Sequence, residues 1–203
     1  MLQQHQLVLG HVVLASSRQY SIFAKILHID EKMPKQRALK PVDVVVAFQL
    51  TIKPDQLFSG LASEIGISVS EAHAAIQRLG AANLLTPGSR SVVVSRFWDF
   101  LKFGVPCVYP VQVGPSAIGV PTGASAPVFD GSIEGAESTV WPHADGEAFG
   151  VAIDPLYPRA PELANRNPEL YNRLVILDSL RSGAGREFER AVELLAGLLG
   201  VTA

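Results

Sequence analysis

One segment of the chain carries polar side chains in the pattern of a helix that contacts DNA. Ser70, His73 and Gln77 recur at three- and four-residue spacing, so a helix would hold them on one face. Glutamine can donate to and accept from adenine in the major groove, and serine or histidine can bond to bases or phosphates. These residue types could therefore contact double-stranded DNA if their helix is the second helix of a helix-turn-helix.

Two cations extend this set. Arg78 follows Gln77, and we expect it on the outer face of the same helix, while Arg90 lies at the tip of a predicted hairpin. Both would contact phosphates, where a fixed positive charge releases counterions. The predicted DNA-binding residues are Ser68, Ser70, His73, Gln77, Arg78 and Arg90. The helix has few Lys and Arg residues, which predicts modest affinity or a basic contribution from elsewhere.

Three helices are expected to position these residues. Residues 40–52 have proline in the first turn and apolar residues at helical spacing. Asp55 is a candidate N-cap for the second helix, and Gly66 ends it. Ser68 opens the third, with Glu71 three residues later, which is the pattern of a capping box. Residues 57–85 thus predict a helix, a tight turn and a second helix.

A hairpin is predicted directly after these helices. Leu84 and Leu85 lead into the Thr-Pro-Gly-Ser-Arg segment 86–90, and the β-branched segment 91–95 follows. Proline and glycine between two apolar runs indicate a tight turn between strands. A helix-turn-helix followed by a hairpin is the order of a winged helix.

Residues 39–95 resemble the winged helix-turn-helix domain of MarR-like bacterial transcriptional regulators. The run LASEIGISVSEAHAAIQRLGAANLL and the Pro-Gly turn after it carry the resemblance, which covers under a third of the chain. It implies a homodimer on a pseudo-palindromic DNA site. A winged helix with a long, unrelated C-terminal half also loosely resembles antitoxins of the abortive-infection type, whose partner is a nucleotidyltransferase-like toxin.

The remainder of the chain is less regular. Residues 96–105 predict an aromatic-rich helix buried on two sides, by the rest of the chain or by a second subunit. Residues 104–165 are rich in proline and glycine; we expect a short strand at 108–113 and a mobile loop at 130–139. A helical hairpin from residue 168 ends the chain.

The predicted fold class is therefore α+β, mostly helical. We expect an N-terminal arm or extension at 1–35, a winged helix domain at 36–105, and a loop-rich C-terminal region at 106–203. Met33 offers a second possible start, in which case residues 1–32 are an upstream extension; otherwise they form an arm that packs on the domain or on a partner chain.

Composition restricts the class of protein. Hydrophobic residues make up 48% of the chain, enough for a core, and no apolar run reaches the ~20 residues that span a membrane. The net charge is −2 overall, but +1 over residues 1–32, +3 over 33–104 and −6 over 105–203. This distribution permits DNA contact by the first part only. The single cysteine fits a reducing cytoplasm.

Signals for an enzyme are weak. His143, Asp145 and Glu147 alternate beside glycine and proline, which favours a solvated turn over a metal site. Cys107 is expected to be a buried thiol rather than a nucleophile. The segment GPSAIGVPTG lacks the Lys-Ser/Thr of a phosphate-binding loop, and SGAGR at 182–186 has no preceding strand. We expect no metal, no cofactor and no enzymatic activity.

The sequence thus predicts a cytoplasmic, homodimeric DNA-binding regulator, most simply a repressor. Its acidic C-terminal half would mediate dimerisation or sense an effector or a protein partner. The alternative is an antitoxin or interaction module that neutralises a co-encoded protein through residues 105–203.

Overall fold

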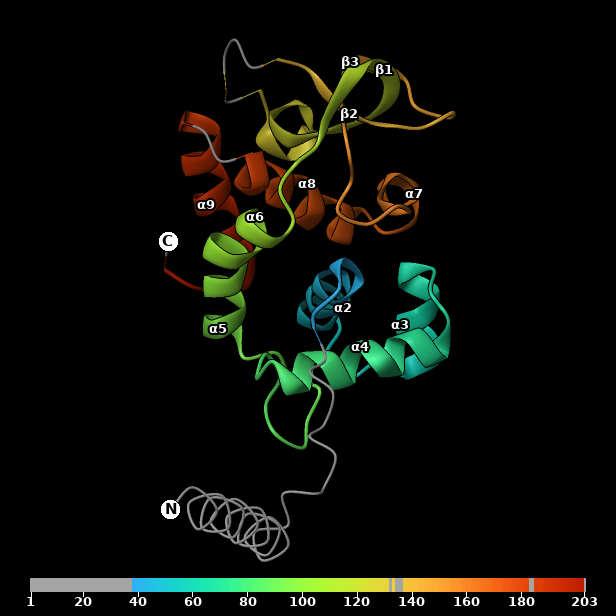
Figure 1. Cartoon of the computed structure of the whole chain (residues 1–203), viewed down its shortest axis with the longest axis vertical. Helices are drawn as coiled ribbons and strands as arrows, with labels where there is room; N and C mark the ends of the chain where they lie inside the picture. Colours follow the sequence, from blue (N-terminus) through green and yellow to red (C-terminus); the bar gives the residue numbers. More distant parts are fainter. Residues whose placement is uncertain (1–37, 132, 134–136, 183–184, 203) are drawn as a thin grey trace, which may run out of the picture. The chain divides into compact units, whose positions relative to one another are not determined.

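The computed structural model describes residues 38–131, 133, 137–182 and 185–202. In these residues the chain is α+β, as predicted: helices dominate and one small sheet is present (Figure 1). The predicted arm at 1–35 lies outside the described residues. The helices are α2 (Pro41–Ile52), α3 (Phe58–Ile65), α4 (Val69–Ala81), α5 (Val94–Asp99), α6 (Val105–Val108), α7 (Ala160–Arg166), α8 (Pro168–Ser182) and α9 (Gly185–Leu199).

Helix α2 lies at the centre of the fold, between α4 on one side and α8 on the other (Figure 1). Proline at its first position and an apolar interior begin and stabilise it, as the sequence predicts. Its residues 43–50 are all buried, because helices cover it on more than one side. Asp43 and Gln49 are therefore buried along with the valines, and each needs a hydrogen-bonding partner.

The turn between α3 and α4 follows the predicted local signals, with two corrections. Gly66 ends α3 with a φ of 82°, and the Ser68 Oγ accepts from the Glu71 amide at 3.1 Å. The Glu71 carboxylate, however, accepts from Arg78 instead of completing a capping box. Asp55 is not the N-cap of α3, because Leu57 occupies that position.

The predicted hairpin is present but short. Leu85 pairs with Val92 in a single antiparallel bridge, and the Thr86 amide donates to the Ser91 carbonyl at 2.9 Å. Helix α5 already begins at Val94, so the predicted strand at 91–95 ends earlier than expected. The turn 86–91 projects beside α4 (Figure 1).

The aromatic-rich helix is confirmed, with α5 and α6 joined through a π-helical segment at Phe100–Gly104. Phe97 and Trp98 are buried, but 64% of Phe103 is exposed, so burial on two sides is wrong for this residue within the chain. Cys107 is also exposed, which corrects the expected buried thiol. No strand forms at 108–112, because α6 extends to Val108 and the strand begins at Val113.

A closed three-stranded sheet occupies the region that the sequence left without structure. It contains β1 (Val113–Thr122), β2 (Thr139–Pro142) and β3 (Ala148–Ile153). Strand β1 is antiparallel to both partners: Ile118 pairs with Phe149 of β3, and Val120 pairs with Trp141 of β2. Strands β2 and β3 are parallel and close the barrel.

Glycines make this closure possible. A Cβ on Gly119 would overlap the backbone of Trp141, and a Cβ on Gly146 would overlap the backbone of Gly119. A Cβ on Gly150 would overlap the backbone carbonyl of Ser138. These positions need glycine because backbones approach each other without room for a side chain. The predicted loop at 130–139, of which part lies outside the described residues, leads from β1 into β2.

A buried carboxylate attaches the sheet to α8. The Asp178 carboxylate accepts from Thr122 Oγ1 at 2.8 Å and from Trp141 Nε1 at 2.6 Å, and it pairs with Arg181. Burial raises the pKa of Asp178, while Arg181 and these donors oppose the rise. One side chain of α8 thus holds β1 and β2 in place.

The predicted helical hairpin of α8 and α9 is confirmed, and α8 is buried along most of its length. The segment that joins them, 183–184, lies outside the described residues. Contacts of α2 with α8 and of α5 with α9 cross residue 105, so residues on both sides of the predicted domain boundary share one core. In the part of the chain that the structure describes, no helix is long and apolar enough to span a membrane.

We expect Tyr171 of α8 to make the free energy of unfolding depend on pH. Burial raises its pKa from 10.0 to about 12, and its hydroxyl donates to the Pro121 carbonyl at 2.6 Å. As the pH rises, the hydroxyl of Tyr171 therefore loses its proton in the unfolded chain before it does so in the folded chain. The contribution of Tyr171 to the free energy of unfolding is complete below about pH 10 and falls as the pH rises towards 12. Urea unfolding from pH 9 to 11.5 should show the stability advantage of wild type over Tyr171→Phe shrinking. A constant difference would contradict this assignment.

Candidate nucleic-acid interface

Helix α4 separates its buried residues from its exposed ones. Ala72, Ala75 and Leu79 are buried against the core. Ser68, Ser70, His73 and Gln77 are all exposed, as the sequence predicts. The Ser68 and Ser70 hydroxyls lie 3.1 Å apart at the start of the helix. The polar residues near the N-terminus of α4 therefore form one accessible surface.

Phe58 connects this surface to the hairpin. The His73 imidazole stacks on the Phe58 ring, with centroids 3.6 Å apart and an angle of 18° between the planes. The Arg90 guanidinium lies 4.9 Å from the centroid of the same ring. Its Nη1 also donates to the Gln56 carbonyl at 2.7 Å. Helix α3, helix α4 and the hairpin thus converge on one aromatic side chain.

The sequence reasoning did not identify Phe58 as part of this site. Phe58 is the first residue of α3, which begins later than the predicted N-cap at Asp55 implies, and its stacking on His73 depends on how α3 crosses α4. Arg90 is half-buried rather than fully exposed, because the turn folds its side chain back onto Gln56 and Phe58. Its guanidinium lies against the same Phe58 ring on which His73 stacks.

Arg78 does not lie on the outer face, and this prediction is wrong. Only 8% of the residue is exposed. Its Nε donates to Asp43 Oδ2 at 2.8 Å and its Nη2 to Asp43 Oδ1 at 2.7 Å. The Asp43 carboxylate raises the pKa of Arg78. The guanidinium compensates a buried charge of α2, which leaves no role for Arg78 in phosphate contact.

A second carboxylate extends this ion pair to the surface. Glu71 Oε1 accepts from Arg78 Nη2 at 2.7 Å and lies 3.9 Å from Lys40 Nζ. The Asp43 Oδ2 also accepts from the Lys40 amide at 2.8 Å. Helix α4 is therefore joined to the start of α2 by charged groups at two of its turns.

The positive charge of residues 33–104 is only partly available for a nucleic acid. Arg78 is neutralised, Lys53 pairs with Glu64 at 2.8 Å, and residues 35 and 37 lie outside the described part. Arg90 is half-buried against Phe58, and Arg96 is exposed, with its Nη1 3.3 Å from the Asn83 carbonyl. The exposed face of α4 is therefore polar rather than basic, as its sequence predicts.

The C-terminal half holds the end of α3. The Tyr157 hydroxyl lies 3.3 Å from the Ile65 carbonyl, and Arg159 donates to the Gly66 carbonyl. Arg166 Nη2 donates to the Ser63 carbonyl at 2.9 Å. Carbonyls at a helix C-terminus lack partners within the helix. Side chains of the segment leading into α7, and of α7 itself, supply those partners and fix the turn before α4.

The predicted turn at 143–147 packs against β1, where the His143 amide donates to the Ile118 carbonyl at 3.3 Å. The Asp145 amide donates to His143 Nδ1 at 3.3 Å. Among the described residues, no three His, Cys, Asp or Glu side chains lie close enough together to hold a metal ion. The SGAGR segment lies partly outside those residues.

No protein-family model, curated protein or solved structure matches the chain. The assignment of a function therefore depends on the geometry of the α4 surface.

Proposed function

We propose that the protein is a sequence-specific DNA-binding transcriptional regulator, a repressor, that uses a winged helix-turn-helix. Helix α4 would enter the major groove and the short hairpin would be the wing. The observation that supports this most is that α4 exposes Ser70, His73 and Gln77 together, while charged and apolar contacts fix its other side to α2.

The proposal gives a role to each residue of the surface. Gln77 has the donor and acceptor needed for the edge of an adenine. The stack on Phe58 orients the His73 imidazole, so its edge can reach a base or a phosphate. Arg90 would contact the backbone from the wing. With few cations available, we expect affinity to be modest and to depend on a second copy bound to a pseudo-palindromic site.

A mobility-shift assay against the DNA upstream of the gene tests this proposal. Wild type should bind at low salt and lose affinity between about 50 and 200 mM salt, because phosphate contacts release counterions. Gln77→Ala combined with Arg90→Ala should weaken binding at least about tenfold, since one good base contact alone accounts for about 1–3 kcal/mol.

The matched control is Gln112→Ala with Arg186→Ala, which removes the same residue types from exposed positions away from α4. It should bind as wild type does, and both double variants should remain folded at the assay temperature. Absence of binding at low salt, or equal loss of affinity in both double variants, would contradict the proposal.

A further inference from the structure

The outer face of the small sheet carries large apolar side chains that no other described part of the chain covers. Ile118 of β1 and Phe149 of β3 are directly paired, so their side chains lie next to each other on one face. Ile118 is 59% exposed and Phe149 is 68% exposed. Single exposed apolar residues are ordinary, whereas neighbouring ones often mark a binding surface. We call Ile118 and Phe149 the sheet face.

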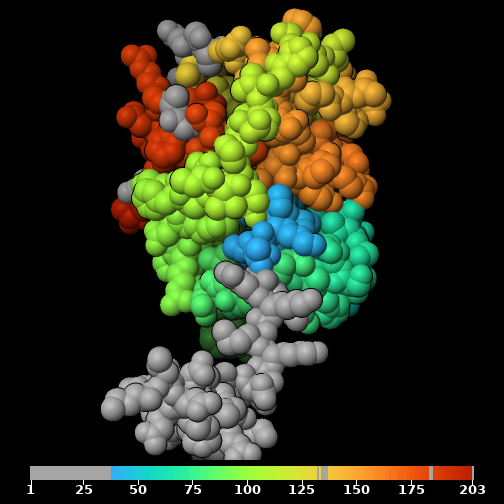
Figure 2. Space-filling model, viewed as in Figure 1, coloured from blue at the N-terminus to red at the C-terminus, as the bar shows by residue number. Residues whose placement is uncertain are grey.

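The opposite side of the sheet is already occupied. Thr122 and Trp141 are buried and bond to Asp178, so this side packs on α8 (Figure 1). Figure 2 shows β1, in yellow-green, at the surface beside the orange part of the chain that includes β3. Because the barrel is closed, with each strand paired to the other two, it offers no long free edge for strand addition. A partner would therefore bind across the sheet face through side chains.

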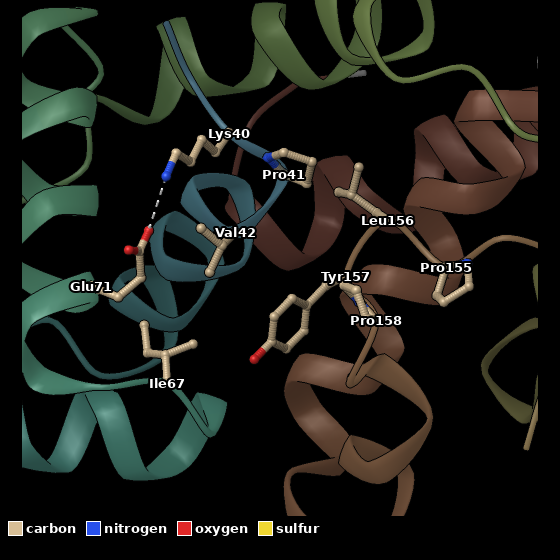
Figure 3. Close-up of a pocket in the computed structure, with 9 residues that line it drawn as sticks. All are labelled: Lys40, Pro41, Val42, Ile67, Glu71, Pro155, Leu156, Tyr157 and Pro158. Atoms are coloured by element: carbon tan, nitrogen blue, oxygen red, sulfur yellow. Dashed lines mark ion pairs between the residues drawn. The ribbon is translucent and has the colours of Figure 1, made fainter. Parts of the chain in front are cut away.

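The segment that contains the sheet has no lysine or arginine. Lys102 and Arg159 are consecutive basic residues of the sequence, and six acidic residues lie between them. Five of these six are described and exposed: Asp130, Glu137, Asp145, Glu147 and Asp154. Among the residues that the structure describes, none of the five carboxylates has a lysine or arginine partner. Glu71 of α4, by contrast, pairs with Lys40 (Figure 3) and with Arg78.

Backbone contacts bring some of these carboxylates next to the sheet face. The turn 143–147 contains Asp145 and Glu147, and its first amide donates to the Ile118 carbonyl at 3.3 Å. On the β2 side of β3, the carbonyl of the residue after Glu137 accepts from a β3 amide at 2.8 Å. The sheet face therefore combines apolar side chains with unpaired negative charge, which is complementary to a partner that carries apolar side chains and cations.

The same charge disfavours other occupants. It would repel the phosphates of nucleic acids and anionic lipids, and two copies of the sheet face in contact would place carboxylates against carboxylates. Apolar side chains and cations occur together on basic amphipathic helices, which bind by laying their apolar stripe on an apolar surface. We propose that the sheet face docks a basic amphipathic helix of a partner protein. This interaction goes beyond the proposed DNA binding and does not depend on it.

The probe is a synthetic amphipathic helix of leucine and lysine, about 18 residues or five turns long. Its matched partner has glutamate in place of every lysine. Binding to the full-length protein, without DNA, is followed by the fluorescence anisotropy of the labelled peptide. The leucine–lysine peptide should bind saturably and at least about tenfold more tightly than the leucine–glutamate peptide. Its affinity should fall as salt is added, because exposed charges are screened.

Ile118→Thr combined with Phe149→Thr removes the two large apolar side chains and leaves β-branched residues, which strands favour. This variant should bind the leucine–lysine peptide at least about tenfold more weakly, since both side chains lose apolar area that the peptide would bury. The matched control is Phe103→Thr with Val108→Thr, which removes two exposed apolar residues away from the sheet and should bind as wild type does. Ile118→Lys alone should weaken binding at least about threefold, and it serves if the double variant does not fold.

The charges are tested separately. Asp145→Asn with Glu147→Gln should weaken binding of the leucine–lysine peptide about three- to tenfold, the effect of two exposed ion pairs. Asp99→Asn with Glu189→Gln removes the same two charges from exposed positions on α5 and α9 and should leave binding unchanged. Equal affinity for the two peptides, or equal losses in the sheet-face variants and their controls, would overturn the proposal.

Sedimentation of the full-length protein distinguishes a second copy of the chain from a partner protein. Wild type and the Ile118→Thr, Phe149→Thr variant should have the same oligomeric state. If only this variant dissociates, the sheet face binds another copy and the basic partner is overturned. A protein that binds the leucine–lysine peptide as expected but shows no mobility shift with DNA would contradict the proposed function and support the docking surface.

Discussion

Replacing Arg78 by methionine should lower the free energy of unfolding by about 3–5 kcal/mol. The substitution leaves the Asp43 carboxylate, which is fully buried, without the guanidinium that donates to both of its oxygens. Breaking a buried ion pair by removing one partner costs this much because the remaining charge stays uncompensated. Urea unfolding of the full-length protein, extrapolated to water, measures the loss.

Two variants make this result specific to the ion pair. Arg78→Met combined with Asp43→Leu should recover most of the stability, since apolar replacement of a whole buried pair is often neutral. Arg96→Met removes an exposed arginine with one long bond and should change stability by less than about 0.5 kcal/mol. Full stability of Arg78→Met, or no recovery in the double variant, would contradict the structural role assigned to Arg78.

Asp178→Ala should lower the free energy of unfolding by a similar amount, about 3–5 kcal/mol. The change leaves the buried Arg181 guanidinium without its carboxylate and removes the acceptor of Trp141 and Thr122. Because these residues belong to β1, β2 and α8, the loss should loosen the sheet. Thermal and urea unfolding, followed by near-ultraviolet circular dichroism, would detect both effects.

The matched control is Glu193→Ala on α9, which breaks an exposed pair with Arg190 and should cost no more than about 1 kcal/mol. Asp178→Asn keeps the size and one acceptor oxygen, so its loss should be smaller than that of Asp178→Ala. Equal stabilities of Asp178→Ala and Glu193→Ala would show that the buried carboxylate does not hold the sheet on α8.

Local signals predicted the helices well because each acts within a few residues. Gly66 and Ser68 set the end of α3 and the start of α4, whatever packs around them. The sheet could not be predicted in this way. Gly114, Pro115 and Gly119 interrupt the pattern of β1, and its pairing with β2 and β3 depends on residues 17–40 positions away.

In the candidate site, too, features set by local signals could be predicted and features set by distant residues could not. The exposure of Ser70, His73 and Gln77 follows from helical periodicity alone. The burial of Arg78 does not, because its partner Asp43 is 35 residues earlier. One signal was present in the sequence. Asp43 directly precedes three valines of a buried helix, so its carboxylate requires a cation nearby, and Arg78 is the one arginine of α4.

Sequence-specific recognition by α4 is the central claim, and selection from a random duplex pool tests it most directly. Wild type should enrich a defined motif in which one position requires adenine. Gln77→Ala should enrich the same motif with that position relaxed, while Gln112→Ala should give the wild-type motif. A pool that stays random with wild type, or an unaltered motif with Gln77→Ala, would contradict the claim that α4 contacts bases through this face.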